Sequence, residues 1–205
     1  AASSFARCDR RELGLKVRVN TASPRCSPRT AALSAAGCVL MVGPLIAFAL
    51  SPGSLCPSSA ALVHASCKIS ATVSGSCADA RAEMIARVNG QYATWHDPHN
   101  NGSYVITNNA TNLELSRTTG GAGTYTDHLA FAFTDSSSGC ELSGCSASQV
   151  YSIKDFSTNY CNLRMLYCGS ADGCKPVLHD LTAVESSVDP SIGAGKDQSA
   201  CIKVR

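Results

Sequence analysis

The chain has 205 residues, a formal net charge of +2 and only 16% charged side chains. From Ser66 onward, ten Lys/Arg and thirteen Asp/Glu make the longest continuous region mildly acidic. A mildly acidic domain lacks the clustered Lys/Arg that binding to phosphates requires, so we expect no nucleic-acid partner. No motif indicates a cofactor.

Residues 1–30 form a basic leader, with seven Lys/Arg and two Asp/Glu, and residues 31–50 form an apolar segment. This order predicts a signal peptide, in which residues 31–50 are the hydrophobic region and cleavage follows Ala49 or Ala65. The alternative is a single membrane anchor, because twenty residues at about 1.5 Å each span a bilayer. Positive charge before the segment places the later residues outside the cytoplasm. We therefore expect a secreted or extracytoplasmic protein that contacts a membrane only through residues 31–50, if these are uncleaved. An organelle lumen is the alternative for a leader so rich in Arg and Ser.

Residues 51–66 are rich in Ser, Pro and Ala and are typical of a linker, so the folded domain is predicted to span residues 67–205. That span holds eight cysteines, and an even number behind a translocation signal predicts about four disulfides. Cysteine parity also favours cleavage after Ala65, which leaves Cys56 out of the set. The spacings do not match structural zinc sites. The eight predicted disulfide cysteines are Cys67, Cys77, Cys140, Cys145, Cys161, Cys168, Cys174 and Cys201.

One helix is predicted over residues 78–94. Ser76 and Asp79 have the spacing of a capping box. Apolar residues then recur at helical spacing, and we expect Ile85, Val88 and Tyr92 to pack on a sheet.

Alternating patterns after the helix predict strands. They cover residues 103–107, 113–117, 125–134, 149–153, 160–168 and 177–184. The prediction is an α+β fold, with one N-terminal helix packed on a curved antiparallel sheet of five or six strands.

Two kinds of site are candidates. Asn101 and Asn109 are N-glycosylation sequons in predicted turns. The 95–102 loop gathers Trp95, His96, Asp97 and His99, and loops on a rigid scaffold commonly present binding groups. His96 and His99 are a weak metal candidate, with His128 as a distant third ligand. The competing interpretation is a solvated connector.

Three stretches carry a family resemblance: residues 145–168, the loop that begins Trp95-His-Asp-Pro-His, and the run from Asp172 through Cys174 to Pro176. They resemble uncharacterised secreted cysteine-rich domains of algae and other microbial eukaryotes. The resemblance covers about residues 67–204 and implies a single secreted domain, without an assigned activity.

No catalytic motif stands out. The stretch before Lys196 lacks the first glycine of a phosphate loop, and no G-x-S-x-G motif is present. We therefore expect an extracytoplasmic, disulfide-rich binding or structural module without catalytic activity, with a protein or glycan partner. One alternative is a secreted hydrolase that uses the His96/His99 loop or His128. The other is a carrier of a small apolar ligand, in a sheet pocket lined by Leu129, Phe131, Phe133, Leu163 and Met165.

Overall fold

A computed structural model describes residues 55–120 and 125–203, all within one compact unit, Phe48–Arg205. The basic leader and the apolar 31–50 segment lie outside the described residues. No helix in the described ranges is long and apolar enough to cross a membrane. The elements in chain order are β1 (Ser66–Val73), α1 (Cys77–Asn89), β2 (Ser103–Asn108), β3 (Leu113–Thr119), β4 (Tyr125–Ser136), β5 (Gly139–Ser148), α2 (Thr158–Tyr167), a 3₁₀ helix (Ser170–Asp172), β6 (Ala183–Pro190) and α3 (Gln198–Cys201).

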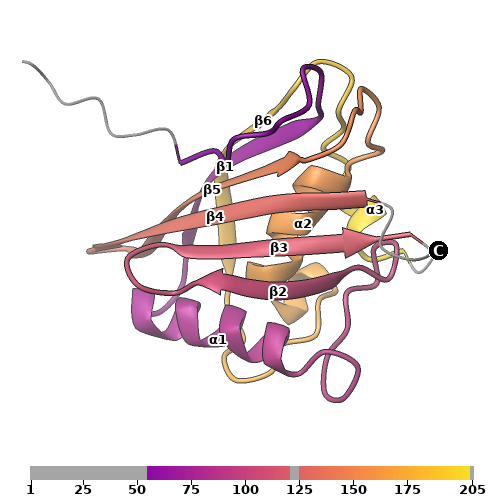
Figure 1. Ribbon diagram of the computed structural model, residues 1–205. Coiled ribbons are helices and arrows are strands. Elements are labelled where there is room, and N and C mark those ends of the chain that lie inside the picture. The colour runs from indigo at the N-terminus through magenta and orange to yellow at the C-terminus, as the bar shows by residue number, and fades with distance from the viewer. Residues whose placement is uncertain (1–54, 121–124, 204–205) are drawn as a thin grey trace, which may run out of the picture. The chain divides into compact units, whose positions relative to one another are not determined.

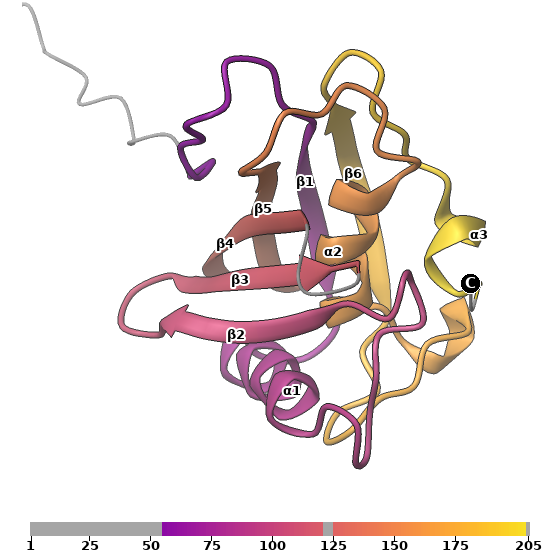
Figure 2. The same cartoon turned by 45° about the vertical axis from the view of Figure 1, so that its right-hand side comes forward.

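The six strands form one antiparallel sheet in the order β2-β3-β4-β5-β1-β6 (Figure 1). Alternate residues of β1 and β3 are buried, as the period of two requires, whereas the last five residues of β5 are buried on both faces. In β1, for example, Cys67, Ile69, Ala71 and Val73 are buried. These residues join the side chains of α1 and α2 in one core, and we call this face of the sheet the inner face (Figure 2). The predicted α+β class is confirmed, and the number of strands is the larger of the two that were predicted.

Helix α1 begins at the predicted cap. The Ser76 hydroxyl accepts from the Asp79 N–H, and Asp79 accepts from Ser76 N–H in return. The helix ends at Asn89, five residues before the predicted end. Val88 is buried as predicted, but Tyr92 lies beyond the helix with a φ of +62° and is 61% exposed, so its predicted place on the sheet is wrong.

The predicted strand over residues 160–168 is wrong, because this stretch belongs to helix α2. Every residue from Asn159 to Tyr167 is buried, so the apparent alternation in the sequence did not distinguish two faces. A helix that is buried all round loses the stripe that identifies it. Residues 149–153 are a loop, and the last strand lies about six residues later than predicted.

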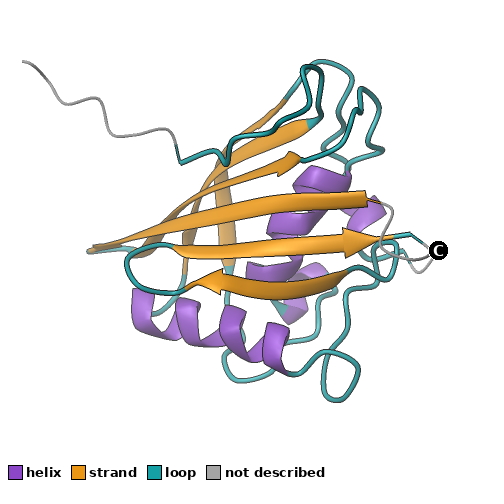
Figure 3. Ribbon diagram, in the orientation of Figure 1, coloured by secondary structure: helices purple, strands orange, loops and turns teal. Residues whose placement is uncertain are grey.

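Strands β1 and β5 were not predicted. β5 is rich in Ser, Gly, Ala and Cys rather than in β-branched and aromatic residues, whereas β1 contains Ile69, Thr72 and Val73 with strand alternation, a signal that the sequence analysis missed. The loops over residues 55–65, 149–157 and 191–197 gather at one end of the sheet, as the teal segments of Figure 3 show. Backbone hydrogen bonds tie them there, including Ser148 N–H to Ala65 O at 2.9 Å and Ser152 N–H to Val63 O at 3.2 Å.

Four disulfides staple the fold, which confirms the predicted number. They join Cys56 to Cys145, Cys77 to Cys140, Cys161 to Cys201, and Cys168 to Cys174.

One cysteine assignment is corrected. Cys67 is the one unpaired thiol of the described residues, and Cys56 takes its predicted place. Burial, followed by the negative charge of Asp155, raises the pKa of Cys67 to about 12, so the thiol stays protonated. The parity argument for cleavage after Ala65 therefore fails, since that cut would remove Cys56 from its disulfide.

Candidate functional site

Four buried polar side chains form a row across the inner face of the sheet. Tyr104 on β2 lies opposite Arg117 on β3. Arg117 lies opposite Asp127 on β4, which in turn lies opposite Ser148 on β5. Each is at most 5% exposed. The inner positions of a sheet normally carry apolar groups, so this arrangement, which we call the polar row, marks a specialised part of the core.

Asp97 balances the charge of Arg117. Asp97 Oδ2 accepts hydrogen bonds from Arg117 Nε at 2.9 Å, from Nη2 at 2.6 Å and from the Tyr104 hydroxyl at 3.0 Å. Burial by itself would lower the pKa of Arg117, but the charge of Asp97 outweighs it and the pKa lies above its ordinary range. A Cβ at Gly102 would collide with the guanidinium, so only glycine allows the loop to approach so closely. The 95–102 loop thereby holds Arg117 charged and in place.

Helix α2 lies over the row and contributes two buried carboxamides. Asn162 Nδ2 donates to Asp127 Oδ2 at 2.8 Å, and Asn159 Nδ2 donates to Ser148 Oγ at 3.0 Å. Ser148 Oγ in turn donates to Asp127 Oδ1 at 2.6 Å. Arg117 Nη1 and Asn162 Oδ1 are buried without a hydrogen-bond partner among the described residues. Because nearly all buried polar groups of native proteins are paired, these two atoms single out the surroundings of Asp127.

The polar row ends at a cavity of about 260 Å³, which we call the sheet-end cavity. Asp127 and Ser148 are members of the polar row and also line the cavity, so the buried carboxylate of Asp127 is part of the cavity wall. This volume lies just below the range of about 300–1,000 Å³ that is usual for drug-sized ligands. The surface of the cavity is mainly apolar, and its uncharged polar lining residues include Asn100, Thr119, Ser152 and Thr158.

A strained turn before α2 forms another part of the wall. Phe156 and Ser157 have φ values of +51° and +72°, which non-glycine residues rarely adopt. Asp155 Oδ1 accepts from the N–H groups of Ser157 and Gly195, both at 3.1 Å, and Oδ2 accepts from Asn159 N–H at 3.0 Å. These bonds hold the turn, which leaves the Phe156 ring 68% exposed beside the cavity.

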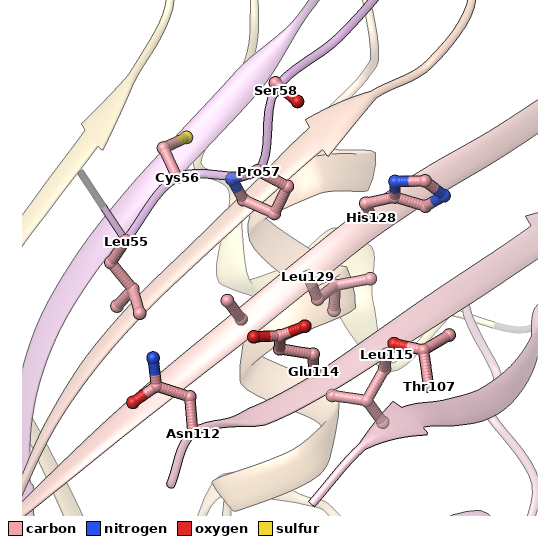
Figure 4. Close-up of a pocket in the computed structure, with 11 residues that line it drawn as sticks. Leu55, Cys56, Pro57, Ser58, Thr107, Asn112, Glu114, Leu115, His128 and Leu129 are labelled. Atoms are coloured by element: carbon pink, nitrogen blue, oxygen red, sulfur yellow. The ribbon is translucent and has the colours of Figure 1, made fainter. Parts of the chain in front are cut away.

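A larger hollow of about 710 Å³ lies on the outer face of the sheet, under residues 55–58 (Figure 4). The disulfide to Cys145 holds Cys56 there. Glu114 on β3 and His128 on β4 line the hollow, and the hydrogen bonds of the described residues include none between them. Glu114 is half-buried and His128 is exposed. Because it contains no buried charged group, this hollow offers less directed chemistry than the smaller cavity.

The structure separates the predicted residues of the 95–102 loop. Trp95, Asp97 and His99 are buried, and only His96 faces solvent. His99 Nδ1 lies 2.9 Å from Ala200 O, and its Nε2 lies 3.2 Å from Thr158 Oγ1. The two imidazoles thus do not share a surface. Within residues 55–120 and 125–203, no group of three or more His, Cys, Asp or Glu could hold a metal ion.

Both sequon asparagines are exposed. Asn101 follows Asn100, which lines the sheet-end cavity. Asn109 Oδ1 accepts from Arg81 Nε at 2.9 Å. Glycosylation at the two positions stays a prediction.

The sequence analysis missed Arg117, Asp127 and the two α2 asparagines. A signal for the first two was present. Arg117 lies on the same face of its strand as Leu113 and Leu115, and Asp127 lies on the same face of its strand as Leu129 and Phe131. A charged residue at a position where strand alternation predicts an apolar residue is the signal that could have identified them. Asn159 and Asn162 carried no such signal, because their segment was predicted as a strand.

Comparison of the chain with protein-family models, curated proteins and solved structures finds no match.

Proposed function

We propose that this protein is an extracytoplasmic, disulfide-stapled binding module without catalytic activity, and that the sheet-end cavity is its ligand site. Four disulfides are compatible with an oxidising compartment. They also anchor the elements around the cavity, because Cys161 of α2 is joined to α3 and Cys145 of β5 to the 55–65 segment.

The observation that carries the proposal is the position of Asp127. Its side chain is held in the core by Ser148 and Asn162, and each oxygen accepts one of these hydrogen bonds. A carboxylate offers about four acceptor positions, so Asp127 retains capacity for a ligand in the cavity that it lines. A buried charge is costly to maintain, and a binding role gives it a purpose that packing does not.

The two alternatives have less support. A carrier of apolar ligands needs an empty apolar pocket, but Leu129, Phe131, Leu163 and Met165 are at most 2% exposed in a filled core. A hydrolase would use His96, His99 or His128, but His99 is buried, and no hydrogen bond among the described residues joins the exposed His96 or His128 to a carboxylate.

The test is a screen of small polar compounds against the oxidised full-length chain by protein-observed NMR. We expect binders to shift the amide signals of Ser148, Ser152 and Thr158, and we expect Asp127→Asn to weaken them. Binders that instead shift only Thr107 and Ala130, at the outer-face hollow, would contradict the proposal.

A further inference from the structure

The charges that line the sheet-end cavity are not equally available to a ligand. Asp155 accepts four hydrogen bonds within the protein, two from backbone N–H groups to Oδ1 and two from Asn159 to Oδ2. Its acceptor positions are therefore used. Asp127 has capacity left, and Lys154 is exposed. A ligand thus meets one usable carboxylate and one ammonium.

This arrangement disfavours an anion. The start of α2 would otherwise attract a phosphate or carboxylate through its N–H groups. Asp155 already accepts from the N–H groups of Ser157 and Asn159 through its side chain and from that of Thr158 through its carbonyl. The buried charge of Asp127 adds repulsion.

A cation is disfavoured for a different reason. It would approach Asp127 past the ammonium of Lys154, which lines the same cavity. An ammonium group also only donates hydrogen bonds, whereas the Thr119 hydroxyl of the cavity wall can both donate and accept. The Ser152 hydroxyl is already used, because it accepts from Ala65 N–H and donates to Val150 O, and Thr158 Oγ1 lies 3.2 Å from His99 Nε2. A neutral ligand that carries several hydroxyls uses both capacities.

Aromatic rings complete the pattern. Phe156 and Tyr125 line the cavity and are 68% and 54% exposed. The ring of Phe156 is held there by a strained backbone, and such strain persists when the surrounding structure enforces it, often at functional sites. The negative face of an aromatic ring attracts C–H groups that carry partial positive charge, and the face of a sugar ring presents such groups.

We infer that the sheet-end cavity binds one neutral hexose ring, either free or at the end of a glycan. In this arrangement Asp127 accepts hydrogen bonds from ligand hydroxyls, Lys154 donates to a ligand oxygen, and Phe156 stacks on the C–H face. The inference rests on the proposed function, and it adds the class of ligand. The volume of about 260 Å³ suits a single ring rather than a longer chain.

The test uses sugars of different charge, titrated into the oxidised chain and followed by NMR and calorimetry. Glucose, glucosamine and glucuronate compare a neutral, a cationic and an anionic ring, and galactose and mannose vary the stereochemistry. We expect at least one neutral hexose to bind about tenfold more tightly than its charged analogues. Methyl glycosides then distinguish a free sugar from the end of a glycan as the ligand. A site for glycan ends accepts the methyl group, whereas a site for the free sugar excludes it.

Matched variants test the roles of the residues. Phe156→Ala should weaken binding of the neutral hexose about tenfold, whereas Tyr151→Ala, which removes an aromatic ring of similar exposure outside the cavity, should leave it unchanged. Asp127→Asn should weaken binding by about tenfold or more, through loss of a charged acceptor. Thermal unfolding of each variant verifies that it is folded, and Phe156→Ala alone decides the question if Asp127→Asn unfolds.

Three outcomes would overturn the inference. Tighter binding of glucosamine or glucuronate would reassign the ligand class and leave the proposed function standing. Equal loss of hexose binding in the Phe156 and Tyr151 variants would show that the hexose does not bind in the cavity. If no sugar binds and the compound screen also gives no ligand at the cavity, the inference and the proposed function fail together.

Discussion

Two buried arginines in this protein differ in whether every guanidinium nitrogen has a hydrogen-bond partner. Arg87 of α1 donates Nε to Glu83 Oε1 at 2.7 Å, Nη1 to Met165 O at 2.8 Å and Nη2 to Cys168 O at 2.7 Å. Glu83 in turn accepts from three successive backbone N–H groups, of residues 177–179, at 2.6–2.8 Å. Every nitrogen of this guanidinium is paired, and the centre ties α1 to the end of α2 and to the segment before β6.

Arg117 leaves Nη1 without a partner in the described part of the chain, and its neighbour Asp127 opens onto a cavity. Both centres are inside the protein, so burial does not distinguish them. The difference is completeness, because a fully satisfied network fixes structure and an incompletely satisfied one retains capacity for another molecule. We therefore assign Arg87 to the scaffold and the polar row to the site.

The largest expected effect comes from breaking the complete centre. Glu83→Gln should lower the free energy of unfolding by about 3–5 kcal/mol, since it leaves the Arg87 charge buried without its partner. Urea denaturation of the oxidised protein measures this loss. Glu114→Gln, on the outer face of β3, is the matched control and should change stability by about 0.5 kcal/mol or less. Similar losses in the two variants would remove the distinction between centre and surface.

The same centre predicts a dependence on pH. Burial would raise the pKa of Glu83, but hydrogen bonds from His179 N–H, Arg87 and the neighbouring amides outweigh it, and the pKa lies below its ordinary value of 4.5. A lowered pKa contributes stability that is present above pH 4.5 and is lost as the pH falls through the folded-state value. In this window the parent protein should lose up to about 1.4 kcal/mol per pH unit more than Glu83→Gln. Parallel stability curves below pH 4.5 would contradict this prediction.

Asp127→Asn should cost less, about 1–2 kcal/mol, because its two hydrogen-bond partners are neutral and Arg117, whose charge Asp127 also stabilises, keeps Asp97 as its bonded partner. Ligand binding at the sheet-end cavity should nevertheless weaken by about tenfold or more. Urea denaturation and NMR titration on the same sample separate the two effects. A stability loss as large as that of Glu83→Gln would place Asp127 with the scaffold instead.

Phe156→Gly should have the smallest effect, with the opposite sign. Relief of the positive φ should raise the free energy of unfolding by up to about 1 kcal/mol, while the loss of the ring should weaken binding about tenfold. Tyr151, which has no positive φ, provides the control, and Tyr151→Gly should lower stability slightly. A loss of stability in Phe156→Gly would show that the Phe156 ring stabilises the fold by packing and is not held free for a ligand.

Local patterns in the sequence predicted several elements of the fold correctly. The capping box placed the start of α1, and β2, β3 and β4 have the alternation of residues with one buried face. These features depend on neighbours within a few residues, so one chain is enough to read them. The same reasoning failed for α2, where burial on all sides removed the helical stripe, and for β5, whose small residues carry little strand propensity. β1 has the alternation of a strand and was overlooked.

The candidate site depended on register. Arg117 and Asp127 lie ten residues apart in the chain, and only the pairing of β3 with β4 places them opposite each other. Asn162 and Asp97 then reach them from a helix and a loop that the sequence did not relate to these strands.

The sequence by itself determined the α+β class and the start of α1, because strand alternation and capping depend on residues close together in the chain. Its cysteine count led to the right number of disulfides, although with Cys67 in the place of Cys56. The tertiary structure alone decided that Cys56 rather than Cys67 is paired, which 95–102 side chains are buried, and where a carboxylate meets a cavity. Those outcomes require contacts between segments far apart in the chain, and the free energy of such contacts depends on the packing of the whole domain.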